Sequence, residues 1–225
     1  MLIIFDLDDT LIDTSGCITP VKLVDALHRM CAAGLFVEKI EEAEASLKRI
    51  DRTKLSAEET LKEFLESCGA DEKYLEVGLK EIYENLKIDM PVDLVEGAEE
   101  LLTEFNLLHT LAIVTIGKQE TQLAKLKKAG IDLSLFSRIV VLEERNKKFH
   151  YQKIAGELGF LSSEVIVCGD RIHIDLTPAK ELGFKTVHIK RGRGLNSCEP
   201  KSDVDFTISR LSEMKDIIKT NVKRK

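Results

Sequence analysis

Apolar residues gather in six short, nearly continuous runs along the chain rather than in an alternating pattern. Continuous runs are typical of strands in a parallel sheet, because helices cover both faces of such a sheet. We therefore predict strands at Leu2–Phe5, Leu111–Ile116, Ile139–Leu142, Val165–Cys168, Thr186–Ile189 and Val204–Ile208.

Helical spacing fills most of the stretches between these runs. Apolar residues recur there at intervals of three and four, and Gly130, Gly159 and Gly183 stand where a helix would stop. The predicted helices are Glu96–Phe105, Gln119–Ala129, Tyr151–Leu158, Pro178–Leu182 and Arg210–Ile218. The alternation of strand and helix predicts the α/β class, with a three-layer, Rossmann-like parallel sheet.

Residues 14–90 break this rhythm, because they show helical periodicity and no convincing strand. Pro20 suits the first turn of a helix through Val21–Met30, and Ser56–Glu59 has the pattern of a capping box. A further helix is expected at Asp71–Leu86. We therefore predict an all-α cap domain at 14–90, inserted into a core domain made of 1–13 and 91–225.

Composition narrows the choice of partners. The 225 residues include 33 Lys and Arg against 39 Asp and Glu, a net charge of −6. This balance does not favour nucleic acid or an anionic membrane surface, which attract clustered cations. No apolar window approaches the roughly 20 residues of a spanning helix, and the start lacks a signal-peptide pattern. The five scattered cysteines form no CxxC pair, which favours free thiols and a cytoplasmic location.

The most informative polar residues directly follow the first strand. Asp6 and Asp8 stand two positions apart in the run Asp-Leu-Asp-Asp-Thr, so an extended chain places both side chains on one side. Ligands of open parallel sheets bind at the carboxyl ends of the strands. Crowded carboxylates there would repel each other, and Mg²⁺, which prefers oxygen ligands, would relieve that repulsion. The alternative is an acidic turn without a bound ion.

Three later features fit the same end of the sheet. Thr115 ends the second strand and could hold phosphate oxygens or simply cap the next helix. Asp170 follows the fourth strand, and Asp175 comes five residues later; they could join a metal site or lie in a loop. Lys147 and Lys148 could neutralise a phosphoryl group or form a solvated basic loop.

Taken in order, these features resemble the haloacid dehalogenase superfamily. The motifs that carry the resemblance are FDLDDTL at 5–11, IVTIG at 113–117, NKK at 146–148 and CGDRIHID at 168–175. The first and last are specific, and the middle two are not. The segment 169–192 looks especially like the phosphatases of the superfamily, and the helical insert after the first strand resembles a C1-type cap.

The resemblance implies an Mg²⁺-dependent phosphatase that hydrolyses a small phosphorylated metabolite through an aspartyl-phosphate. By the same resemblance, Asp6 would be the nucleophile and Asp8 the general acid and base. Thr115 would bind the phosphoryl group. The implied Mg²⁺ ligands are Asp6, Asp170 and the backbone carbonyl of Asp8, with Asp175 supporting them.

One position departs from the family pattern, and other functions compete with hydrolysis. The lysine motif lacks its usual proline, since Phe149 follows Lys148; we favour Lys148 as the lysine of the site, with Lys147 close behind. A dehalogenase is disfavoured because those enzymes usually lack the second aspartate. A phosphomutase on a sugar phosphate and a non-catalytic regulator stay open as alternatives, and the sequence gives no oligomeric state.

The acidity of the chain is unevenly distributed. Residues 14–90 hold 11 Lys and Arg against 16 Asp and Glu, a net of −5, whereas the remaining residues hold 22 against 23. An acidic cap does not favour long polyanions, and it fits a small ester bound beneath it. We therefore expect poor activity on polynucleotide ends.

Overall fold

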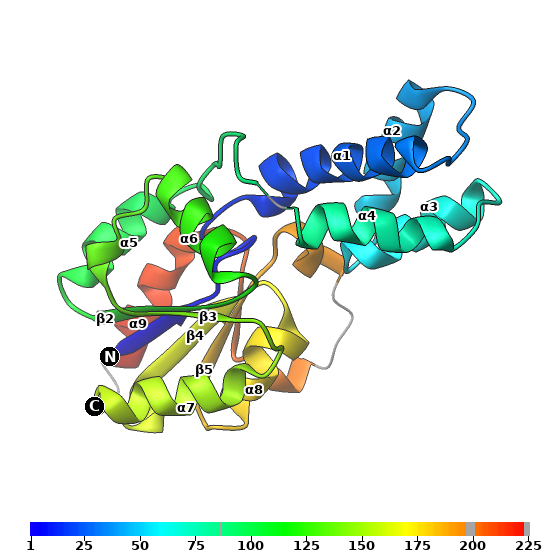
Figure 1. The fold of residues 1–225 in the computed structure, drawn as a ribbon. Coiled ribbons are helices and arrows are strands. Elements are labelled where there is room, and N and C mark those ends of the chain that lie inside the picture. The colour runs from blue at the N-terminus through cyan, green and yellow to red at the C-terminus, as the bar shows by residue number, and fades with distance from the viewer. Residues whose placement is uncertain (86, 197–200, 223–225) are drawn as a thin grey trace.

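The sheet predicted from the apolar runs is present in a computed structural model that describes residues 1–85, 87–196 and 201–222 (Figure 1). Six parallel strands lie in the order β3-β2-β1-β4-β5-β6. Their bounds are β1 Leu2–Phe5, β2 Thr110–Ile116, β3 Phe136–Leu142, β4 Val165–Gly169, β5 Lys185–Ile189 and β6 Phe206–Ile208. The predicted α/β class is confirmed.

Both faces of the sheet are buried, which explains why the strands are continuously apolar. In β1, Ile3 and Phe5 join one hydrophobic cluster, and Leu2 and Ile4 join the other. Helices α5 (Ala98–Asn106), α6 (Gln119–Lys128) and α9 (Met214–Val222) cover the first face. Helices α7 (Lys147–Glu157) and α8 (Thr177–Lys180) cover the second (Figure 1).

Four helices project from one side of this core, and we call them the helical cap (Figure 1). They are α1 Thr19–Ala32, α2 Ile40–Asp51, α3 Ala57–Ser67 and α4 Lys73–Tyr83. Ser56 caps α3 as the sequence predicts, because its side chain accepts a hydrogen bond from the Glu59 amide. The last predicted helix of this segment reaches Leu86, which lies outside the described residues.

The cap helices bury a hydrophobic cluster of their own, centred on residues such as Leu27, Leu47 and Phe64. Gly78 allows α4 to approach the neighbouring helices, since a Cβ there would lie 2.8 Å from Leu61 Cδ1. Each cap helix is amphipathic and turns its apolar side to this cluster. The cap is therefore packed around separate apolar residues from those of the sheet.

The order of the strands defines where polar groups can meet. Strand β1 pairs with β2 on one side and with β4 on the other. Strands β2 and β3 therefore lie on one side of β1, and strands β4 to β6 lie on the other. Side chains at the carboxyl ends of β1, β2 and β4 converge at this switch point, where ligands of open α/β sheets bind. Among the described residues, no helix has the length and apolar content needed to cross a bilayer.

Candidate active site

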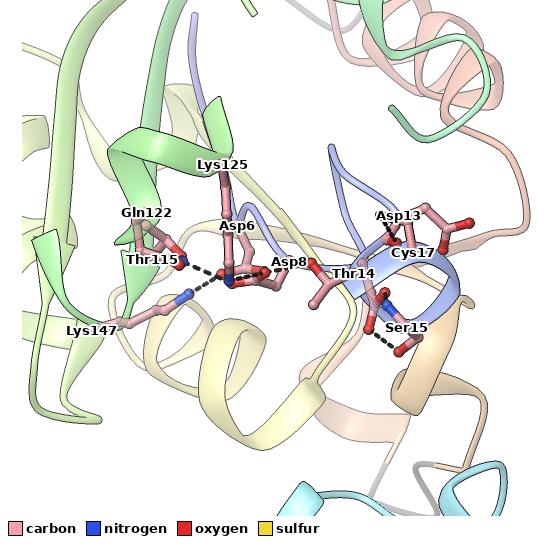
Figure 2. A network of polar contacts seen from close by, with 11 residues as sticks. Asp6, Asp8, Asp13, Thr14, Ser15, Cys17, Thr115, Gln122, Lys125 and Lys147 are labelled. Carbon is pink, nitrogen blue, oxygen red and sulfur yellow. Dashed lines mark hydrogen bonds and ion pairs between the residues drawn. The ribbon is translucent and has the colours of Figure 1, made fainter. Parts of the chain in front are cut away.

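Asp6 stands directly after β1 and is buried at the switch point. Its amide donates to the Cys168 carbonyl of β4 at 2.9 Å, which continues the parallel pairing one residue past the strand. Its carboxylate lies 2.6 Å from the Lys147 ammonium (Figure 2). Lys147 Nζ also donates to an Asp175 carboxylate oxygen at 2.7 Å and to the Val114 carbonyl at 2.8 Å. All three donors of the ammonium therefore have a buried acceptor.

The structure corrects our preference between the two adjacent lysines. Lys147 is 1% exposed and reaches Asp6, whereas Lys148 points outward and pairs with Glu181 at 2.7 Å. The reason is that α7 begins at Lys147, four residues before the predicted start at Tyr151. Within a helix, Lys147, Tyr151 and Ile154 share one buried face, and Lys148 is rotated away from it.

Three buried carboxylates form a group that could hold a cation. Oxygen atoms of Asp6, Asp170 and Asp175 lie within 4.8 Å of one another. Gly169 makes this approach possible, since a Cβ there would lie 2.6 Å from Asp175 Cβ. Hard oxygen donors of this kind suit Mg²⁺. The Asp8 carboxylate is not in this group, and the predicted Asp8 ligand is its backbone carbonyl.

The pKa shifts of these carboxyl groups indicate that the group carries an excess of negative charge. Burial raises the pKa of Asp6 to about 7, with further increases from the Asp175 and Asp8 charges, although Lys147 opposes them. Burial and the charges of Asp175 and Asp6 also raise the pKa of Asp170 well above its ordinary value. The Lys147 ammonium and the charge of Arg171, which acts on Asp170, together still leave three buried carboxylates with an excess of negative charge. A divalent cation fits both the donor set and the charge.

Asp8 is held separately by three donors from two directions (Figure 2). Thr14 Oγ1 and Lys125 Nζ donate to Oδ1, the latter at 2.7 Å, and Gln122 Nε2 donates to Oδ2 at 2.8 Å. Burial works to raise the pKa of Asp8, but the Lys125 charge and these hydrogen bonds outweigh it. The pKa is therefore lowered from its ordinary value. Asp8 is ionised in this arrangement.

Thr115 lies beside Asp8 but is completely buried. Its hydroxyl accepts a hydrogen bond of 2.6 Å from the same Gln122 nitrogen that contacts Asp8 (Figure 2). Gln122 packs closely on Gly117, where a Cβ would lie 3.1 Å from Gln122 Cδ. Sequence reasoning missed both Gln122 and Lys125. Their spacing of three residues places both on one face of the helix that follows Thr115, but it does not show that this face is turned toward the site.

A turn with an unusual backbone fixes the direction of Asp8. Asp9 has φ of 56°, and its carboxylate accepts from the Ser15 amide at 2.7 Å and from the Ser15 hydroxyl at 2.6 Å. The Asp9 amide donates to the Ile12 carbonyl at 2.8 Å and closes the turn. A left-handed aspartate is uncommon and persists where its surroundings hold it. The contacts of Asp9 therefore stabilise the turn after β1, and this turn directs the Asp8 side chain toward α6.

Comparison with known proteins agrees with this geometry. A family model for haloacid dehalogenase-like hydrolases matches residues 3–189. The chain belongs to this family. The resemblance inferred from the four motifs is thereby confirmed, and with it the assignment to a hydrolase family.

Curated relatives of this haloacid dehalogenase-like chain are named as phosphatases. The glyceraldehyde 3-phosphate phosphatase of Methanocaldococcus jannaschii is 30% identical over 99% of this chain and 98% of its own length. The protein of the same name from Methanopyrus kandleri is 28% identical over 96% of both chains.

Solved structures share the fold at low sequence identity. A predicted phosphoglycolate phosphatase from Haemophilus somnus 129PT aligns with a TM-score of 0.70 at 18% identity, covering 96% of this chain and 97% of its own. The HAD-hydrolase YfnB from Bacillus subtilis aligns with a TM-score of 0.65, also at 18% identity and over the same shares. These likenesses support the architecture alone.

A cavity of about 550 Å³ separates the cap of this haloacid dehalogenase-like hydrolase from the sheet. Its floor includes Asp8 and Asp170, and its cap wall includes Leu23 and Tyr83. Arg193, from the loop after β5, lines the same cavity and pairs with Asp51 of α2 at 2.8 Å. The site is therefore enclosed by both parts of the chain.

Proposed function

We propose that the chain is an Mg²⁺-dependent phosphatase acting on a small phosphate monoester through an aspartyl-phosphate on Asp6. The observation that carries this proposal is the Lys147 ammonium, 2.6 Å from Asp6 and 2.7 Å from Asp175, at the carboxyl end of the central strand. We further propose that residues 1–13 and 91–225 are the catalytic core and that 14–90 form its cap.

In the first step, an Asp6 carboxylate oxygen attacks phosphorus and the bond to the leaving oxygen breaks. The pairing with Lys147 fixes the orientation of the carboxylate and offsets negative charge near the transferring phosphoryl group. Thr115 supports the same group: Gln122 occupies an acceptor site of its hydroxyl, so the hydroxyl proton stays available for a phosphoryl oxygen.

Asp8 is proposed as the acid of this step and the base of the next. Its ionised form, which the contacts with Lys125 and Gln122 favour, accepts a proton from the water that attacks the aspartyl-phosphate. A bound phosphate ester brings negative charge beside Asp8, and a like charge raises the pKa of a carboxyl group. Substrate binding therefore favours the protonated form that donates to the leaving oxygen.

The cation would be held by Asp6, Asp170 and the Asp8 backbone carbonyl, with Asp175 holding Lys147 and the loop beside them. When bound, Mg²⁺ supplies positive charge to the carboxylates and to phosphoryl oxygens. The Arg171 amide donates to Asp175 at 3.0 Å, so this carboxylate also fixes the turn after Asp170.

The leaving group is proposed to be small and triose-like. The support is the cavity of about 550 Å³, together with relatives named as glyceraldehyde 3-phosphate phosphatases. The cap covers the site and would limit access of bulk water during transfer.

The test is phosphate release from glyceraldehyde 3-phosphate and from a chromogenic aryl phosphate, with Mg²⁺ and with excess chelator. We expect activity only with the cation, and a loss of at least about 1,000-fold in Asp6→Asn, because the covalent route then has no nucleophile. Equal activity of Asp6→Asn and the unmodified protein would refute the assignment.

A further inference from the structure

Helix α6 presents two buried polar side chains to the site, although sequence reasoning gave this helix no role in chemistry. Gln122 is 1% exposed and Lys125 is 6% exposed. They are three residues apart and share one face of the helix. Leu126, the next residue, is fully buried in the hydrophobic cluster on this side of the sheet. The polar pair therefore occupies positions that could have been apolar.

Burial of this pair has a cost that packing does not explain. Ordering long side chains such as Lys and Gln loses rotamer freedom, and an ammonium removed from water must be paired. Buried ion pairs are often no more stabilising than apolar residues of similar volume. The contacts that Gln122 and Lys125 make with residues of the site indicate why they are buried.

Gln122 joins two residues of the proposed machinery through one nitrogen. Its Nε2 donates to Thr115 Oγ1 at 2.6 Å and to Asp8 Oδ2 at 2.8 Å. An amide NH₂ has two protons, so both bonds form at once. The distance between the Thr115 hydroxyl and the Asp8 carboxylate is thus set by a single group.

Lys125 fixes the other oxygen of the same carboxylate. Its Nζ lies 2.7 Å from Asp8 Oδ1, which also accepts from Thr14, at the start of the connection to the cap. Because Gln122 holds Oδ2 and Lys125 holds Oδ1, the Asp8 carboxylate can neither rotate nor tilt toward the cap without breaking a hydrogen bond. The Asp8 side chain is still 26% exposed, so a substrate in the cavity can reach it.

We propose that Gln122 and Lys125 are positioning residues that hold the Asp8 carboxylate in register with Thr115 for both of its proton transfers, to the leaving oxygen and from the attacking water. This inference rests on the proposed phosphatase function, because the position of Asp8 matters for catalysis only if Asp8 transfers protons in that reaction. A displacement of about 1 Å at a reacting group costs on the order of 100-fold in rate. Neither side chain needs to touch the substrate for this effect.

The experiment measures kcat and KM on an activated aryl phosphate. Its leaving group departs without a proton, so variants of Asp8 keep measurable activity, and kcat depends on Asp8 through its role as base in the hydrolysis of the aspartyl-phosphate. The variants are Gln122→Met and Lys125→Met, each also combined with Asp8→Asn. Lys128→Met and Gln152→Met are matched controls, because both side chains are exposed on helix surfaces. Thermal unfolding of every variant separates loss of fold from loss of position.

We expect each single variant to lower kcat by about 10- to 100-fold with KM changed by less than about threefold, and the controls to match the unmodified protein. In the Asp8→Asn background, the same substitutions should cause no further loss, because they act through Asp8. Lys125→Arg, which keeps the charge and a donor, should recover part of the lost kcat.

Two results would overturn the inference. One is a rise in KM at unchanged kcat, which would make these residues substrate ligands. The other is full additivity with Asp8→Asn. If Lys125→Met alone fails to fold, Gln122→Met and Lys125→Arg decide the question by the same criteria. An inactive unmodified protein, or an active Asp6→Asn, would instead refute the proposed function.

Discussion

Lys147, the first residue of α7, and Asp6, the first residue after β1, form a buried ion pair of 2.6 Å although 141 positions separate them. The pair spans two strands of the sheet, because Lys147 also bonds to the Val114 carbonyl of β2. It brings a cation to the carboxylate that we propose as nucleophile, and it excludes the neighbouring lysine from that position.

The first prediction separates the two lysines. Lys147→Met should lower kcat by at least about 100-fold, because the group that offsets charge on Asp6 is lost. It should also lower the free energy of unfolding of the metal-free protein by about 3 kcal/mol, since Asp6 and Asp175 are left buried without a counter-charge. Lys148→Met is the control, and we expect its kcat within about twofold of the unmodified protein. Equal losses in the two variants would contradict the placement of α7.

The second prediction concerns pH in the absence of metal. The pKa of Asp6 is raised in the folded protein to about 7 by burial, so the folded state binds this proton more tightly than the unfolded chain does. Stability of the metal-free protein should therefore fall as pH rises from about 4 to about 7. Asp170 acts in the same direction. Asp8 has a lowered pKa, so its contribution is retained above about pH 4 and is lost only in more acidic solution.

Melting temperatures in chelator at pH 5 and pH 7.5 test this expectation. Added Mg²⁺ should raise the melting temperature more at pH 7.5 than at pH 5, because protons compete with the cation for the carboxylates. Asp6→Asn should flatten the dependence in chelator. A melting temperature that rises across this interval, with the same slope in Asp6→Asn, would contradict the raised pKa.

The third prediction uses two glycines in different surroundings. Gly169→Ala should destabilise the protein by about 1–3 kcal/mol and impair activity, because its Cβ would overlap the Asp175 side chain. Gly156→Ala should stabilise it by about 0.5–1 kcal/mol, since that glycine lies within α7 with no atom near the added Cβ. Urea unfolding of both variants tests the prediction. A Gly169→Ala protein as stable as the unmodified protein, or more stable, would contradict the close approach of Asp175 to Gly169.

The fourth prediction concerns substrate size. Residues 14–90 carry a net charge of −5, and the cavity beneath them is about 550 Å³. We expect kcat/KM for glyceraldehyde 3-phosphate to exceed that for a 5′-phosphorylated oligonucleotide by more than about 100-fold, because like charge and size both exclude the polymer. Comparable values for the two substrates would contradict an enclosed site.

The sheet was predictable from sequence because burial on both faces leaves a simple pattern. β1 has the predicted bounds, and β2 and β4 each differ by one residue at one end. The start of α7 was not predictable in the same way. Lys147 is a polar residue that is buried in the first turn of α7, so hydrophobic periodicity does not mark that turn. Periodicity alone therefore does not distinguish Lys147, which contacts Asp6, from Lys148, which pairs with Glu181.

Contacts between distant segments set the limit for the rest of the site. Asp6, Asp8 and Asp170 could be proposed from their places after predicted strands, since parallel strands share a carboxyl edge. Gln122 and Lys125 lie within a helix, where polar residues normally face water, and only the packing of α6 against the turn after β1 turns them inward. Likewise, the pairing of Arg193 with Asp51 depends on how the cap meets the core.

The proposed phosphatase mechanism requires that Asp6 becomes phosphorylated during turnover. The most direct measurement is mass spectrometry of peptides after rapid acid quench of Asp8→Asn with Mg²⁺ and an activated aryl phosphate. Loss of the base should slow hydrolysis of the intermediate more than its formation from such a substrate. We predict one added phosphoryl group on the peptide that contains Asp6, and none in Asp6→Asn. A phosphoryl group on another residue, or turnover by Asp6→Asn at the unmodified rate, would contradict the account.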